Sequence, residues 1–240
     1  MKKITKGIQA PELTKWLEDN AGLPQNLAYG AAKFPIAEVL KGLLVEQGYV
    51  CAYTLLRIGE ASAHIEHLKP QTLCRSDDTS RAAAKLPLRK EDIAWSNMVA
   101  CAPEPNIKVK PPYGATKKDD WWDAEFFLSP LDVTCEERFA YTNDGKIASS
   151  SAADVAAKET IERIGLGKEK LCELRKEAFL QAGIHKRSDK PITSVVKVEQ
   201  LIAKWSKKNQ ATSECVEFCV PLVQVAKEYA KFLRTRGHRE

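Results

Sequence analysis

Two hydrophobic periodicities alternate in the N-terminal half of the chain. Apolar residues at helical spacing predict helices over residues 11–20 and 37–47, and Gly48 is placed to end the second one. Residues 49–58 and 63–68 are instead rich in β-branched and aromatic side chains, which predicts two strands joined by a short turn.

The next hundred residues give weaker signals. Residues 71–89 show no strong periodicity and predict an exposed insertion. Residues 93–100 predict a short helix that carries Trp95 and Met98. Residues 108–118 are rich in proline, glycine and lysine, which predicts a loop.

The C-terminal half opens with the clearest hairpin signal in the chain. Asn143-Asp144-Gly145 separates residues 139–142 from 146–149, as expected for a tight turn between two strands. From residue 151 the pattern is helical, and the predicted helices cover 153–164, 168–182, 195–207 and 214–236. The fold class is therefore α+β. We expect a mixed core with N-terminal helices over residues 1–150, and a helical region over 151–240 packed on it.

Composition narrows the picture only slightly. The hydrophobic share of 44% and the charged share of 29% are typical of an ordinary globular protein. A net charge of +5 suits a nucleic-acid partner but does not require one. The basic N-terminus is not followed by an apolar stretch, and no run approaches the roughly 18 apolar residues of a membrane span. Seven cysteines, an odd number, predict reduced thiols and a cytoplasmic protein.

Three residues carry the candidate chemistry: Glu66, His67 and Asn97. A neutral imidazole at His67 can accept a proton from an attacking water or hydroxyl. The neighbouring carboxylate of Glu66 can help to hold a divalent cation over a scissile phosphate. Asn97, about thirty residues later, can fix the loop that bears the histidine. The pattern predicts a phosphodiesterase site of the ββα type.

These residues belong to a longer series of matching motifs. The chain resembles the PtuB-like HNH endonucleases, the nuclease subunits of the Septu anti-phage system, which also occur beside retrons. The motifs that carry the resemblance are Gln47-Gly48-x-x-Cys51-Ala52-Tyr53, Arg57-Ile58, Ile65-Glu66-His67-x-x-Pro70-Gln71, Asn97-x-x-x-Cys101, Ser129-Pro130-Leu131 and Gly145-Lys146-Ile147. Lys3 to Gly7 and Thr160-Ile161 to Arg175 are also similar. The resemblance implies an α+β fold with an HNH (ββα-type) nuclease core, flanking helices and a helical C-terminal region.

The chain departs from the family at its zinc positions. Family members carry Cys-x-x-Cys at residues 51–54 and a later cysteine at Gly114, and these with Cys101 imply four thiolate ligands. Here Cys51 and Cys101 alone remain. Two ligands are too few for a closed tetrahedral site, so we expect no structural zinc, although Cys74 or Cys135 could substitute.

A second departure concerns the catalytic metal. The family's ligand on the short helix falls on Ala115, which cannot bind a cation. Glu66 alone is a weak site for Mg²⁺ or another divalent cation, and Asp119 or Asp120 could stand in. No cofactor follows with certainty.

The loss of a metal ligand favours RNA as the substrate. The 2′-hydroxyl of RNA is a built-in nucleophile that needs only a general base, whereas DNA hydrolysis needs an activated water. A structured RNA such as a tRNA is a reasonable target for a defence toxin. The candidate phosphate-binding cations are Arg57, Lys69, Lys117 and Lys118.

The resemblance also implies partners. A PtuA-like ATPase is expected to restrain the toxin, and a retron reverse transcriptase with its msDNA is a further candidate. The helical region over residues 151–240 is the expected partner-binding part. The alternative function is a catalytically inactive HNH scaffold that binds nucleic acid or bridges proteins of a defence complex.

Three further features have two interpretations each. His64 shares a strand face with Glu66 and either assists it or is simply exposed. Trp121-Trp122 either stacks on bases or belongs to the core. The basic stretch 231–239 either follows a phosphate backbone or is a solvated helix end.

Overall fold

A computed structural model of the protein describes residues 1–236. Within this range the α-helices are α1 (Pro11–Asp19), α2 (Ile36–Gln47), α3 (Gln71–Ala83), α4 (Ala115–Lys118), α5 (Val155–Ile164), α6 (Glu169–Gln181), α7 (Val195–Trp205) and α8 (Cys219–Thr235). The strands are β1 (His64–His67), β2 (Met98–Cys101), β3 (Phe139–Tyr141) and β4 (Ile147–Ser149), in two antiparallel pairs, β1–β2 and β3–β4. This is a mixed α+β fold, as the hydrophobic pattern predicts.

The two N-terminal helices are confirmed. Helix α1 begins with a proline, whose missing N–H is not needed in the first turn, and it buries Leu13 and Trp16. Helix α2 buries one apolar face and ends at Gly48, which has a φ of 69°. Glycine adopts this left-handed conformation without the steric cost of a side chain.

The strand predicted over residues 49–58 is wrong. This segment is a compact turn in which the Leu55 N–H donates to the Cys51 carbonyl, and its pairing within the segment is a single bridge between Val50 and Arg57. The predicted strand over 63–68 is confirmed as β1, but its partner is β2. Aromatic and β-branched residues in 49–58 serve the buried core instead of a sheet.

The helix predicted over residues 93–100 is also wrong. A short 3₁₀ turn covers Trp95–Asn97, and the chain then extends as β2, whose four residues are all buried. A strand buried on both faces shows no alternation, so its apolar run can be confused with part of a helix.

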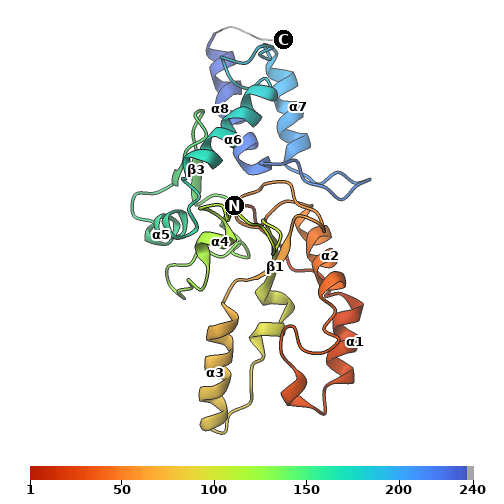
Figure 1. Cartoon of the computed structure of the whole chain (residues 1–240). Coiled ribbons are helices and arrows are strands. Elements are labelled where there is room, and N and C mark those ends of the chain that lie inside the picture. Colours follow the sequence, from red (N-terminus) through yellow and green to blue (C-terminus); the bar gives the residue numbers. More distant parts are fainter. Residues whose placement is uncertain (237–240) are drawn as a thin grey trace.

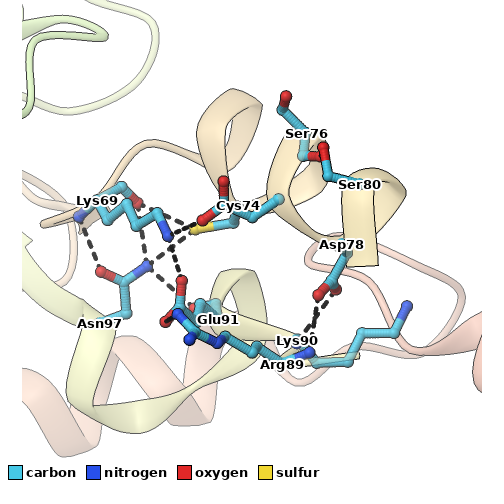
Figure 2. Close-up of polar contacts among 10 residues, drawn as sticks. Lys69, Cys74, Ser76, Asp78, Ser80, Arg89, Lys90, Glu91 and Asn97 are labelled. Carbon is cyan, nitrogen blue, oxygen red and sulfur yellow. Dashed lines mark hydrogen bonds and ion pairs between the residues drawn. The ribbon is translucent and has the colours of Figure 1, made fainter. Parts of the chain in front are cut away.

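Residues 71–89, predicted as an exposed insertion, contain helix α3. Its side chains are largely exposed and Cys74 is its one buried residue, so the sequence carries no amphipathic period there. The returning loop is tied to the helix, because both oxygens of Asp78 accept backbone N–H groups, from Arg89 and Lys90 (Figure 2). The loop predicted over 108–118 holds the one-turn helix α4 at its end.

The hairpin at Asn143-Asp144-Gly145 and the C-terminal helices are confirmed, although α8 begins at Cys219 and not at residue 214. Helices α6, α7 and α8 gather at one end of the molecule, and α1, α2 and α3 lie toward the other (Figure 1). The residues of one hydrophobic core lie between Met1 and Leu166 in the sequence, and those of a second core lie between Phe179 and Leu233. Helix α5 thus packs in the first core, while the domain boundary near residue 150 stays a prediction.

Among residues 1–236, none of the helices combines the length and the apolar character that crossing a bilayer requires. The last part of the basic stretch 231–239 lies outside the described residues, so its role stays open.

Candidate functional site

The β1–β2 pair places the candidate residues on two different faces. In the antiparallel register Glu66 lies opposite Val99 and His67 lies opposite Met98. Because side chains alternate along a strand, Glu66 shares its face with His64, whereas His67 points to the opposite, buried face. Glu66 and His67, although adjacent in sequence, therefore belong to different environments.

Asn97 fixes the loop that follows β1 (Figure 2). Its Oδ1 accepts the backbone N–H of Lys69 at 2.8 Å, and its Nδ2 donates to the carbonyls of Lys69 and Glu91, both at 3.0 Å. The carboxamide is buried and uses its donor and acceptor sides together. Asn97 thus holds the chain just after His67, as the sequence predicts. A direct role in catalysis stays a prediction.

His67 is enclosed by protein groups. Its Nε2 lies 2.8 Å from the Asp92 carbonyl and must donate to it, which leaves Nδ1 as the acceptor. The amide of Gln71 covers that nitrogen at 3.3 Å, and the ring of Tyr29 packs edge-on at 4.6 Å between centroids. Burial lowers the pKa of His67 below its usual value of 6.5. The ring is therefore neutral, but no lone pair is open to a substrate unless Gln71 moves.

His64 has the better geometry for proton transfer. Its Nδ1 lies 2.5 Å from the Pro103 carbonyl, to which it donates, so Nε2 carries the lone pair when the ring is neutral. That nitrogen lies 3.6 Å from Oε2 of Glu66. Burial lowers the pKa of His64, but the Glu66 carboxylate and the Pro103 carbonyl outweigh this effect and raise it above 6.5. The side chain is 23% exposed, so its ring is accessible from solvent.

The Glu66 carboxylate is also paired with Lys118. The ammonium of Lys118, at the end of α4, lies 2.9 Å from Oε1 of Glu66. It also donates to the His67 carbonyl at 3.0 Å. Lys118 is 1% exposed and cannot contact a phosphate from this position, which corrects its predicted role in nucleic-acid binding.

The other three predicted phosphate-binding cations also have intramolecular partners, although Arg57 is exposed. The guanidinium of Arg57 donates to the carbonyls of Gly48, Tyr49 and Cys215. Lys117 donates to the Glu162 carbonyl at the end of α5. Lys69 forms ion pairs with Asp77 and Glu91, and its pair with Glu91 lies beside Asn97 in Figure 2. Each would have to leave an internal partner before binding a phosphate.

The residues at this site do not fit a divalent cation. Asp119 and Asp120 are exposed, and Asp120 accepts a hydrogen bond from Thr72 instead of approaching Glu66. Among the described residues, no three His, Cys, Asp or Glu side chains gather closely enough to hold a metal ion. Magnesium needs several oxygen ligands in near-octahedral order, and Glu66 already faces an ammonium.

The zinc positions implied by the resemblance do come together, but without enough thiols. The Cys51 and Cys101 thiols are close enough for Cys101 to lower the pKa of Cys51, and a Cβ at Gly114 would lie 3.2 Å from Thr54. Cys74 instead bonds the Lys69 carbonyl. Cys51 and Cys101 are both fully buried, so they act as small core side chains.

A cleft of about 360 Å³ opens on the Asn97 side of the sheet. Leu68, Lys69, Asn97, Trp122 and Phe127 are among the residues that line it. The Lys69 ammonium lies 5.5 Å from the ring centre of Trp122, which is half-buried. Trp122 therefore offers an aromatic wall on which a base could stack.

No family model and no curated protein matches this chain. His64, for which the sequence left two interpretations, lies beside Glu66 on the same face of β1, as its position two residues earlier predicts. The burial of Lys118 had no signal in the sequence, because it depends on how α4 packs against β1.

Proposed function

We propose that the protein is an HNH-like nuclease effector of an anti-phage defence system that cleaves RNA without a divalent metal. One observation supports the proposal: β1 and β2 form an antiparallel pair although α3 separates them in the chain, α4 follows β2, and Glu66 of β1 forms an ion pair with Lys118 of α4. The sequence resemblance to PtuB-like endonucleases supports the same assignment. On that resemblance, the working partner is a PtuA-like ATPase, with a retron reverse transcriptase and its msDNA as further components.

In the proposed reaction His64 accepts the proton of an RNA 2′-hydroxyl at Nε2. The 2′-oxygen forms a bond to the adjacent phosphorus, and the bond from phosphorus to the 5′-oxygen breaks. The products are a 2′,3′-cyclic phosphate and a 5′-hydroxyl, whose oxygen takes a proton from solvent. Glu66, 3.6 Å from Nε2, stabilises the imidazolium that forms, and the Pro103 carbonyl fixes the tautomer.

The test is cleavage of RNA and DNA oligonucleotides and tRNA by the protein together with its ATPase partner, in EDTA and in Mg²⁺. We expect RNA to be cut in EDTA with cyclic-phosphate ends, and DNA to remain intact. His64→Asn should lower the RNA cleavage rate by about 10²-fold or more, because a general base contributes at least that factor. His185→Asn is the matched control, since His185 is a buried histidine in the second half of the chain.

Loss of all cleavage in EDTA would exclude the metal-free reaction. If the RNA cleavage rate falls in His67→Asn but not in His64→Asn, then His67 is the general base.

The inactive scaffold is a second candidate, favoured because each of the four predicted phosphate-binding cations already has an intramolecular partner. On this alternative, RNA and DNA both survive in every buffer. Cells carrying His64→Asn would also keep their protection against phage, provided that the complex still assembles.

A further inference from the structure

The ammonium of Lys118 lies in a closed shell of oxygen atoms. Oε1 of Glu66 lies at 2.9 Å, and the carbonyls of His67 and Asp119 accept its hydrogen bonds at 3.0 and 3.4 Å. The ammonium thus donates two hydrogen bonds, to carbonyl oxygens, and its contact with Oε1 is an ion pair without hydrogen-bond geometry. The ring of Phe127 is 5.9 Å away, and solvent reaches 1% of the residue.

Both carboxylate oxygens of Glu66 already face a nitrogen group, although Oε1 makes no hydrogen bond within the described residues. Its Oε2 faces His64, and its Oε1 faces the ammonium. The hydroxyl of Tyr53 is buried without a hydrogen-bond partner in the described part of the chain, and burial together with the Glu66 carboxylate raises its pKa. A phenol that stays protonated supplies no anionic ligand. A divalent ion bound to Glu66 would therefore lie close to a fixed positive charge in a site of low polarity, where repulsion is strong.

We propose that the Lys118 ammonium takes the place of a divalent cation at Glu66, so that the folded protein excludes such ions from this site. Lys118 is then a positioning residue: it neutralises Glu66 and holds the carboxylate toward His64. The inference concerns the site of the proposed function and rests on that function only for its catalytic meaning. The ion pair itself can be tested by metal binding, with or without nuclease activity.

The experiment is a Mn²⁺ titration of the full chain, followed by electron paramagnetic resonance. Wild type is expected to bind no Mn²⁺ at Glu66. Lys118→Met keeps an unbranched side chain of similar length, removes the charge and frees the carbonyls of His67 and Asp119 beside Glu66. It should bind one Mn²⁺ with a dissociation constant at least about tenfold below the limit that the wild-type titration sets. The double variant Lys118→Met/Glu66→Gln is the matched control and should lose that binding.

Thermal melting provides a second measurement. Lys118→Met leaves a carboxylate without its partner and should melt about 10 °C below wild type, because breaking a buried ion pair is strongly destabilising. Mn²⁺ should raise the melting temperature of this variant and leave that of the double variant unchanged. The double variant should melt above Lys118→Met, because it no longer contains the unpaired charge.

Two results would overturn the proposal: Mn²⁺ binding by wild type that disappears in Glu66→Gln, or a folded Lys118→Met variant that binds none. If Lys118→Met fails to fold, the Mn²⁺ titrations of wild type and Glu66→Gln still test the proposal. The proposal requires these two titrations to be identical. An RNA-cleavage assay that shows no activity would count against the proposed function, whereas the metal titration would still report on Lys118.

Discussion

Gly145→Ala is expected to lower the free energy of unfolding by about 2 to 5 kcal/mol, the sum of a left-handed backbone penalty and a steric clash. Gly145 has a φ of 81°, and an added Cβ would lie 1.9 Å from the Cys172 carbonyl oxygen. That oxygen belongs to the backbone of α6, which cannot move aside as a flexible side chain would. The Gly145 carbonyl also accepts a 2.7 Å hydrogen bond from the buried Arg175. Chemical denaturation measures the change directly.

Two other glycines separate the causes of this effect. Gly30 has a φ of 73° and open space around its missing Cβ, so Gly30→Ala should cost about 1 kcal/mol from the backbone alone. Gly22 has no neighbour within 4 Å and no positive φ, so Gly22→Ala should be nearly neutral. If Gly145→Ala costs no more than Gly30→Ala, the β3–β4 turn does not pack against α6 in solution.

The β3–β4 turn also shows what sequence patterns can predict. Asn-Asp-Gly predicts the hairpin because a tight turn needs a left-handed residue at a fixed local position. Gly48 predicts the end of α2 for the same local reason. The contact between Gly145 and α6 has no local signature, because it joins residues far apart in the chain. The errors over residues 49–58 and 93–100 have the same origin. In both segments the tertiary environment decided between turn, strand and helix for an apolar run.

In the candidate site, too, local contacts follow from the sequence pattern and long-range contacts do not. A period of two along β1 is enough to place His64 and Glu66 together, and the spacing to Asn97 indicates a loop lock. The partners of His67 come from Gln71, Asp92 and Tyr29, and none of these contacts follows from spacing. Lys118 joins Glu66 across 52 positions, so its burial depended on the packing of α4.

Asn97→Ala is expected to destabilise the protein by about 3 kcal/mol, because buried polar groups that lose their partners cost about 1 to 3 kcal/mol each. The variant leaves the Lys69 N–H and the carbonyls of Lys69 and Glu91 without Asn97. Ser96→Ala is the matched control, since Ser96 is an exposed neighbour in the same turn. Urea denaturation of wild type, Asn97→Ala and Ser96→Ala measures the change in unfolding free energy for each variant. Equal changes for the two variants would show that the Asn97 hydrogen bonds do not stabilise the loop after β1.

Asn97→Asp separates hydrogen bonding from packing, because it keeps the shape of the side chain. One oxygen can still accept the Lys69 N–H, but the other replaces a donor and faces the carbonyls of Lys69 and Glu91. At neutral pH this places a buried negative charge against two acceptors, so the loss should exceed that of Asn97→Ala. Protonation of the new carboxyl restores one donor, so the penalty should shrink as the pH falls from 7 toward 5. Asn97→Ala has no such group, and its penalty relative to wild type should stay constant. A pH-independent penalty for Asn97→Asp would mean that solvent reaches the carboxyl, and that the loop after β1 is open in solution.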